Sequence, residues 1–269
     1  MIEALKQHIS GAGTTEDKVN RTREFLQLTA LKIMFDKHIF DALAFVGGTA
    51  LRILFDLRRF SEDLDFSLVH KKHYHCDKLN NELLRGFSLY GLEVESKPQN
   101  QRTVHSIMLK FPGLLNKLGL SPLKGQKLSI KLEVDTNPPA GWNLTNTVVN
   151  KIYLLDIVHP DLPSLYATKL HACFYRTYTK GRDIYDLIWY LGKGLKPNFA
   201  VLNNAIKQSQ DKSPGINSNN LQEFLLEKLG AIDFNLARKD VERFLEDKRE
   251  LALFETKLLK NTIKRVYGA

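Results

Sequence analysis

The sequence has few cysteines and no long apolar run, and each absence excludes a class of protein. Its 269 residues include two cysteines, Cys76 and Cys173, too few for a disulfide framework. No segment approaches the roughly 18 consecutive apolar residues of a membrane span. The first residues, MIEALKQHIS, lack the basic segment and apolar core of a secretory signal. We therefore expect a cytoplasmic protein that does not enter the membrane.

A structural zinc site is also not expected. His70, His73, His75 and Cys76 stand close together in VHKKHYHC. Zinc sites usually need two separated pairs of ligands, and the sequence offers no second pair. We interpret this segment as a loop that leads into an amphipathic helix over residues 79–90.

Basic residues are in excess. The chain has 39 Lys and Arg residues against 30 Asp and Glu residues, a formal net charge of +9. Hydrophobic residues make up 43% and charged residues 26%, ordinary values for a globular protein. The excess favours polyanionic partners such as nucleic acid or nucleotides.

The strongest pattern lies in residues 45–68, FVGGTALRILFDLRRFSEDLDFSL. Gly47, Gly48 and Thr49 separate a short apolar stretch from an apolar-spaced run, which predicts a strand, a tight turn and a helix start. The unpaired N–H groups and positive dipole end of a helix start can hold a phosphate. Glycine lets the backbone approach an anion closely. Alone, Gly-Gly-Thr is often an ordinary turn.

Two carboxylates follow the predicted helix. On a strand, Asp63 and Asp65 share one face, while Leu64 and Phe66 point into the core. Parallel carboxylates repel each other unless a cation lies between them, and oxygen ligands suit Mg²⁺. Asp-x-Asp alone is often a solvated strand face. A phosphate cradle followed by a metal pair, however, is the minimal apparatus for nucleotidyl transfer.

This segment resembles the signature of DNA polymerase β-like nucleotidyltransferases, in which GG[ST] and a helix precede an acid-hydrophobic-acid-hydrophobic string. GGTAL followed by RFSEDLDF is similar to the AbiEii type of toxin from type IV toxin–antitoxin systems, which includes the MenA-like toxins. The resemblance implies Mg²⁺ as cofactor, an NTP as substrate and a cognate antitoxin encoded nearby. It implies nucleotide contacts from Gly47, Gly48, Thr49 and Ser61, and metal contacts from Asp63 and Asp65.

Arg59 lies between the two halves of this pattern and allows two interpretations. It belongs to the R-F-S-x-D-x-D string of the family that the segment resembles. Its planar guanidinium suits a phosphate contact. It could equally support the loop by pairing with a carboxylate.

A third acid is expected on a later strand. In KLSIKLEVD, residues 127–135, the alternation places Lys127, Ser129, Lys131, Glu133 and Asp135 on one face. The resemblance implies a third metal-binding carboxylate in a hydrophobic-acid-hydrophobic setting, and Glu133 fits it. Asp135 is an alternative on the same face, and an ordinary polar strand face is as good an interpretation.

A second block of charged residues lies on two predicted helices. Lys169, Cys173 and Arg176 fall near one face of the first, and Asp183 and Asp186 share a face of the second. The block resembles a second motif of the AbiEii-type toxins. That resemblance implies catalytic roles in which Lys169 contacts the nucleotide phosphates and Asp183 completes the active site. The alternative is an interhelical salt bridge that joins Lys169 or Arg182 to Asp183 or Asp186.

We predict an α+β protein in two domains. Strand alternation ends near residue 158, and helical periodicity follows. The resemblance therefore implies a polymerase β-like nucleotidyltransferase domain with a mixed sheet over residues 1–158, followed by a helical bundle over 159–269. The last predicted helix, 251–266, carries Lys257, Lys260, Lys264 and Arg265, as a solvated face or an RNA-binding stripe.

The predicted activity is that of a metal-dependent nucleotidyltransferase toxin. We expect in-line attack on the α-phosphorus of an NTP by an RNA hydroxyl. The basic charge and the resemblance together favour the 3′ end of tRNA as the acceptor. One alternative is transfer of NMP to a protein hydroxyl. Another is an inert binding module that keeps the fold, against which the intact Asp63-x-Asp65 argues.

Overall fold

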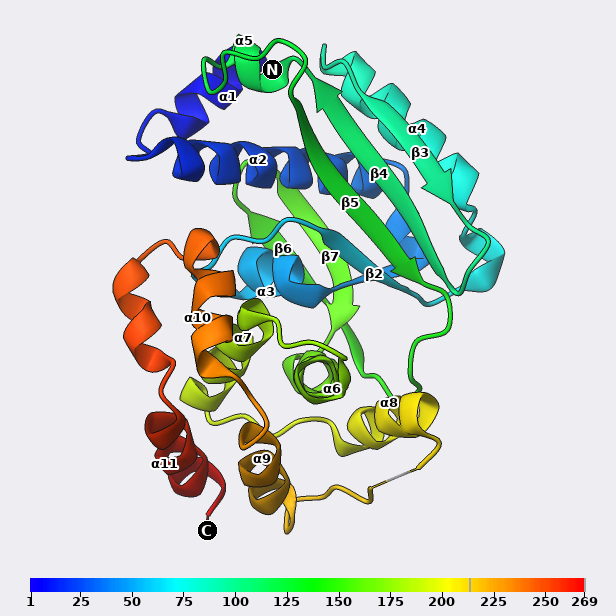
Figure 1. Ribbon diagram of the computed structural model, residues 1–269. Helices are drawn as coiled ribbons and strands as arrows, with labels where there is room; N and C mark the ends of the chain where they lie inside the picture. Colours follow the sequence, from blue (N-terminus) through cyan, green and yellow to red (C-terminus); the bar gives the residue numbers. More distant parts are fainter. Residues whose placement is uncertain (213, 269) are drawn as a thin grey trace. The chain divides into compact units, whose positions relative to one another are not determined.

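The chain has an α+β fold, as predicted. The computed structural model describes residues 1–212 and 214–268 (Figure 1). Contacts divide it into a first unit, residues 1–56, 60–138 and 145–159, and a second unit, residues 57–59, 139–144 and 160–269. The boundary predicted after residue 158 lies beside the end of the first unit, and its role as a boundary between independent domains stays a prediction. No helix in the described part of the chain is long and apolar enough to cross a membrane.

A five-stranded mixed sheet lies at the centre of the first unit, in the order β1-β2-β5-β4-β3. Its strands are β1 (Leu43–Val46), β2 (Leu64–Leu68), β3 (Glu95–Gln99), β4 (Val104–Pro112) and β5 (Lys127–Asp135). β2 and β5 are parallel, and the other neighbours are antiparallel. The alternation predicted for β5 is confirmed, because Leu128, Ile130, Leu132 and Val134 are buried.

Two long helices pack on this sheet and on each other. α2 (Thr15–Asp36) contacts β5, and α4 (Cys76–Leu89) contacts β3 (Figure 1). α2 is capped at its N-terminus, because the Thr14 hydroxyl accepts the Asp17 N–H at 3.1 Å. Phe87 of α4 meets Phe111 of β4 edge to face, with ring centroids 4.9 Å apart. The first unit also contains α1 (Ile2–Ile9) and α5 (Leu114–Lys117).

A strand–helix–strand segment carries the predicted motif. β1 leads directly into α3 (Gly47–Phe55), and residues 56–63 connect α3 to β2. α3 is tied to α2 by Arg52, whose Nε and Nη2 donate to the Glu24 carboxylate at 2.8 and 3.0 Å. Because this pair is bidentate and mostly buried, it fixes the orientation of α3 within the unit.

A second, two-stranded sheet was not recognised from the sequence. It pairs β6 (Leu144–Asn150) with β7 (Leu154–Pro160). Most of β6 is exposed, with only Val149 buried, so its side chains show no clear apolar alternation. β7 ends where the helical part of the chain begins.

The second unit is a helical bundle, as predicted. It consists of α6 (Leu162–Tyr175), α7 (Gly181–Gly192), α8 (Phe199–Gln210), α9 (Leu221–Leu229), α10 (Phe234–Val241) and α11 (Thr256–Tyr267). α7 contacts α6, α10 and α11. The single terminal helix predicted over residues 251–266 is wrong at its start, because a 3-10 helix, Lys248–Leu253, precedes α11. Phe254, buried between the two, interrupts the helical path.

Candidate active site

The start of α3 lies directly against a carboxylate of β2. Gly47, the first residue of α3, has φ of +79°, and a Cβ built on it would lie 2.2 Å from Asp65 Oδ2. Any other residue would be strained and would displace the Asp65 carboxylate. Val46, the N-cap residue, makes no side-chain capping hydrogen bond. The backbone N–H groups of the first turn, at Gly47, Gly48 and Thr49, are thus the donors that the sequence predicted for phosphate oxygens.

Thr49 fixes the start of β2 relative to α3. Its side chain is fully buried, and its hydroxyl donates a short hydrogen bond to the Asp63 carbonyl. The hydroxyl proton is therefore used within the protein, and Thr49 can offer a phosphate only its backbone N–H. Ser61 is half-buried, and its carbonyl accepts Gln27 Nε2 of α2 at 3.1 Å. The loop before the acidic pair is therefore held from both sides.

The predicted third acid lies beside the acidic pair. β2 and β5 are parallel, and their register pairs Asp65 with Glu133. Asp135 pairs instead with Ser67, further along β2, and burial raises the pKa of its carboxyl group against the lowering by the Asn137 N–H. The sequence left Glu133, Asp135 and Asp183 open as the third acid, and of the two on β5 Glu133 is the register neighbour of Asp65.

Lys131 lies beside these carboxylates, a contact that was not predicted from the sequence. Its Nζ lies 2.5 Å from Glu133 Oε1, with the Lys131 and Glu133 side chains 39% and 32% exposed. The hydrogen bond to Glu133 raises the pKa of Lys131, against burial, with further contributions from the charges of Glu133, Asp63 and Asp65. The alternation of β5 had placed Lys131 on the same face as Glu133, so the signal was present in the sequence. We call Asp63, Asp65, Glu133 and Lys131 the carboxylate cluster.

The chemistry of this cluster fits a divalent cation, but its side chains are not arranged as a metal site. Carboxylate oxygens from adjacent strands are the donors that Mg²⁺ prefers. Within residues 1–212 and 214–268, however, no group of three or more His, Cys, Asp or Glu side chains is placed to hold a metal ion. In the segment with His70, His73, His75 and Cys76, the structure has a short 3-10 helix, Lys71–His73, and α4 begins at Cys76, before the predicted start at residue 79.

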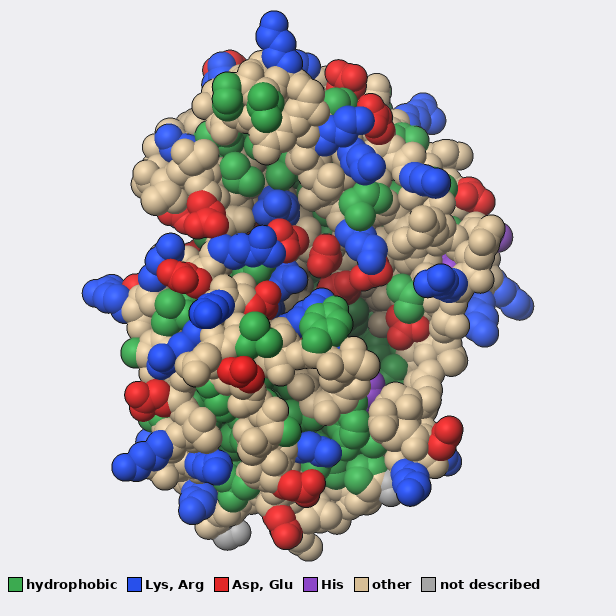
Figure 2. Space-filling view, in the orientation of Figure 1, with side chains coloured by type: hydrophobic (Ala, Val, Ile, Leu, Met, Phe, Trp, Pro, Cys, Tyr) green, Lys and Arg blue, Asp and Glu red, His purple; other side chains and the backbone are tan. Residues whose placement is uncertain are grey.

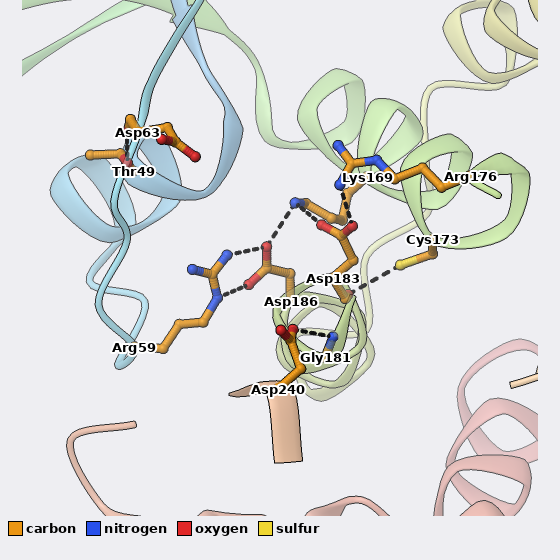
Figure 3. A network of polar contacts seen from close by, with 10 residues as sticks. All are labelled: Thr49, Arg59, Asp63, Lys169, Cys173, Arg176, Gly181, Asp183, Asp186 and Asp240. Atoms are coloured by element: carbon orange, nitrogen blue, oxygen red, sulfur yellow. Dashed lines mark hydrogen bonds and ion pairs between the residues drawn. The ribbon is translucent and has the colours of Figure 1, made fainter. Parts of the chain in front are cut away.

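The second unit holds a buried ionic network built on α6 and α7 (Figure 3). Lys169 Nζ lies 2.8 Å from both Asp183 Oδ1 and Asp186 Oδ2, so the interhelical salt bridge that the sequence offered as the alternative interpretation is present. Arg176 Nη1 donates to Asp183 Oδ2 at 2.8 Å. The Cys173 thiol donates to the Asp183 carbonyl at 3.1 Å.

Arg59 completes the network. It belongs to the second unit with residues 57–59, and its Nε and Nη2 each donate to the Asp186 carboxylate at 2.6 Å. Arg59 and Asp186 have side-chain exposures of 2% and 0%. The sequence left open a phosphate contact or a carboxylate partner for Arg59, and the structure shows a carboxylate partner, Asp186. We call Arg59, Lys169, Arg176, Asp183 and Asp186 the ionic network.

The network contains three cations and two anions, and these charges and their burial shift the pKa values of its members. Burial would lower the pKa of Lys169, but Asp183 and Asp186 outweigh burial and hold the pKa above its ordinary value. Burial would raise the pKa of Asp183, but Lys169 and Arg176 hold it at about 2. Burial raises the pKa of the Cys173 thiol, so this cysteine stays protonated. The surplus positive charge lies at Arg176, whose side chain is 41% exposed.

Comparisons with known proteins agree with these features. A family model described as nucleotidyl transferase AbiEii toxin, type IV toxin–antitoxin system, matches residues 30–259. The crystal structure of JHP933 from Helicobacter pylori is similar with a TM-score of 0.55 and 19% identity, covering 93% of this chain and 92% of that one. A candidate nucleotidyltransferase from H. pylori is similar with the same TM-score and identity, covering 91% and 93%. At this identity the two structures support the fold alone. No curated protein matches the sequence significantly.

Proposed function

The chain belongs to the family of AbiEii nucleotidyl transferase toxins of type IV toxin–antitoxin systems, and on that premise we propose that it transfers NMP from an NTP to the 3′ end of tRNA. Such a transfer would block aminoacylation and so arrest translation. Membership in a toxin–antitoxin family also implies a cognate antitoxin as partner. The proposal adds the metal, the acceptor and the residue roles to the activity of the family.

One observation carries the proposal: Gly47 brings the start of α3 into direct approach to Asp65, which is the register neighbour of Glu133. In this proposal, the donors for a phosphate and the ligands for a cation would therefore lie side by side within the first unit. A nucleotide triphosphate bound to a divalent cation needs both kinds of group next to each other.

The proposed reaction forms one bond and breaks one. The 3′-hydroxyl oxygen attacks the α-phosphorus, and the bond between that phosphorus and the oxygen bridging to the β-phosphate breaks. Pyrophosphate leaves with the bonding electron pair, and the hydroxyl proton passes to a carboxylate of the cluster. Asp63, Asp65 and Glu133 would hold Mg²⁺, which when bound supplies charge neutralisation and lowers the pKa of the acceptor hydroxyl. Gly47, Gly48 and Thr49 would donate backbone N–H groups to phosphate oxygens, with Ser61 as a further nucleotide contact.

We propose roles for Lys169 and Asp183 that are compatible with their contacts in the ionic network. The ammonium group has three donors, and the contacts to Asp183 and Asp186 use two of them. We assign the third to the triphosphate, whose charge Lys169 would offset. Both oxygens of Asp183 pair with cations, Oδ1 with Lys169 and Oδ2 with Arg176, so Asp183 would act by holding these cations in place.

A large anionic acceptor suits the surface charge. The chain carries a net charge of +9, and Lys and Arg side chains are distributed over most of the face shown in Figure 2. α11 buries Leu259, Ile263 and Tyr267 and exposes the predicted basic stripe, which consists of Lys257, Lys260, Lys264 and Arg265. The helix itself contains no acidic residue that would neutralise this stripe.

Transfer from each α-labelled NTP to purified tRNA tests the proposal. We expect label in intact tRNA, dependent on Mg²⁺, and none in tRNA whose terminal ribose has been oxidised. Asp65→Asn is the control for contaminating activity, and it should abolish labelling. Equal labelling of oxidised and intact tRNA would exclude the 3′ end as acceptor. Label in protein but not in RNA would instead support transfer to a protein hydroxyl.

A further inference from the structure

Lys131 occupies a position in the carboxylate cluster that the proposed reaction does not use. Its ammonium group lies 2.5 Å from Glu133 Oε1, on the face of β5 that also carries Asp135. In the parallel pairing of β2 with β5, Leu64 lies opposite Leu132, and Asp65 lies opposite Glu133. Continued by one residue, that register places Lys131 level with Asp63. Asp63, directly before β2, and Asp65 on β2 thus lie beside Lys131 and Glu133 on β5.

The geometry points to Lys131 as an internal cation that holds Glu133 until a divalent metal displaces it. This inference rests on the proposed function, since it takes Glu133 as the third metal ligand. It explains why Asp65 and Glu133 are register neighbours and yet no group of three ligands is assembled in the described residues. The Glu133 carboxylate is already paired with Lys131.

Charge balance supports this role. Three carboxylates side by side would repel one another strongly without a counter-charge. Lys131 reduces the formal charge of the cluster from −3 to −2, which one divalent cation neutralises. A metal that takes Glu133 must first separate it from Lys131 and must then bind close to a displaced ammonium group. Both effects weaken metal binding to the nucleotide-free protein.

The pair is accessible enough to exchange. Lys131 and Glu133 are about one-third exposed, in contrast to the fully buried Arg59–Asp186 pair of the second unit. A partly exposed ion pair contributes little net free energy, so a divalent cation can replace the ammonium group without a large barrier. The flexible side chain of lysine can swing into solvent, where its charge is well hydrated.

Lys127 provides a matched control. It lies on the same face of the same strand and also forms an ion pair, with Nζ 2.6 Å from Glu95 Oε2. Replacing Lys127 by Met removes the same charge and a similar contact. It lies four residues from Lys131, about 13 Å along the strand. An effect specific to the carboxylate cluster will therefore be absent from this variant.

A titration of the full chain with Mn²⁺, without nucleotide, tests the inference. The EPR signal of the free ion measures how much Mn²⁺ remains unbound. We expect Lys131→Met to tighten binding about fivefold to tenfold, because a cation no longer competes for Glu133. Lys127→Met should change the affinity less than twofold. Mg²⁺ should displace the bound Mn²⁺ in every case.

Removing Glu133 shows whether Lys131 acts through it. In a Glu133→Gln background, Lys131→Met should no longer tighten binding, which a double-mutant cycle measures directly. An unchanged or weaker affinity in Lys131→Met overturns the inference, and so does a gain that persists in the Glu133→Gln background. Lys131→Gln repeats the test if the Met variant is poorly folded. The titration needs no NTP or acceptor, so its failure is distinguishable from failure of the tRNA assay.

Discussion

Arg59 and Asp186 form a fully buried, bidentate ion pair between residues 127 positions apart in the sequence. Arg59 follows α3 in the chain but belongs to the helical unit, together with the rest of segment 57–59. An isolated β-bridge between Arg59 and Leu245 holds the same segment. Segment 57–59 is therefore held within the second unit by contacts to Asp186 and Leu245. Arginine suits this position, because its planar fork satisfies both carboxylate oxygens at once.

Breaking this pair should destabilise the protein strongly. Arg59→Lys keeps the charge but cannot form both hydrogen bonds, and Asp186→Asn leaves Arg59 and Lys169 short of a negative partner. We expect each change to lower the free energy of unfolding by about 3 kcal/mol, the order found when one member of a buried pair is lost. Urea unfolding followed by circular dichroism measures the change.

The neighbouring arginine is the control for this experiment. Arg58 pairs with Glu250 at 3.4 Å, and its side chain is 63% exposed. Arg58→Lys should therefore change the unfolding free energy by less than about 0.5 kcal/mol. Equal effects at both positions would show that the Arg59–Asp186 pair contributes no more than a surface contact.

Gly47→Ala should inactivate the enzyme by displacing Asp65. The added methyl group meets the Asp65 carboxylate, and a shift of about 1 Å in a catalytic group lowers the rate by about 100-fold. Gly91→Ala is a matched control, because Gly91 also has a positive φ, +73°, but has nothing within 4 Å of its added Cβ. Both variants should lose about 1 to 2 kcal/mol of stability from backbone strain. Only Gly47→Ala should lose transfer activity, measured with labelled NTP.

The ionic network should make stability depend on acidic pH. The pKa of Asp183 is about 2 in the folded protein and lies near 3.8 when unfolded. A lowered folded-state pKa stabilises the protein above the unfolded value and loses that effect as pH falls from about 4 to 2. The contribution is about 2 kcal/mol. Asp183→Asn should therefore be less stable at neutral pH, and its unfolding free energy should fall less steeply between about pH 4 and pH 2 in chemical unfolding. If the unfolding free energy of the unmodified protein and of Asp183→Asn fell equally over this pH range, the result would contradict the assignment to Asp183.

The motif around α3 could be predicted because its signals are local. The glycines, the helix period and the alternation of Asp63 and Asp65 all lie within a short stretch, and so does the polar face of β5. The class of fold and its helical second part followed from the same periodicities. The polar face of β5 also includes Lys131. Because a lysine on a polar face is usually solvated, its contact with Glu133 was not predicted.

Other features depend on residues far apart in the chain. The pairing of Asp65 with Glu133 depends on the register of two parallel strands, which sequence alone leaves open. The partner of Arg59, Asp186, lies 127 positions away in the sequence and could not be identified from the residues next to Arg59. The exposed strand β6 lacks the apolar alternation that would have revealed it.

The basic stripe of α11 gives the last prediction, which concerns acceptor binding. Lys257, Lys260 and Lys264 are exposed, while the opposite face of the helix is buried by Leu259 and Ile263. Changing the three lysines to Gln should therefore leave the fold intact. If they contact tRNA phosphates, the affinity for tRNA should fall, and so should the slope of log affinity against log salt.

Each lost phosphate contact should reduce that slope by about 0.7 to 0.9, so three should reduce it by about 2 to 3. Fluorescence anisotropy of labelled tRNA at several salt concentrations measures both quantities. A triple change of Lys71, Lys72 and Lys78, which are exposed in the first unit, controls for the loss of net charge. If that variant lowers the slope by the same amount, binding follows net charge, and the stripe of α11 is a solvated face. A loss confined to the α11 variant would place the acceptor on this helix.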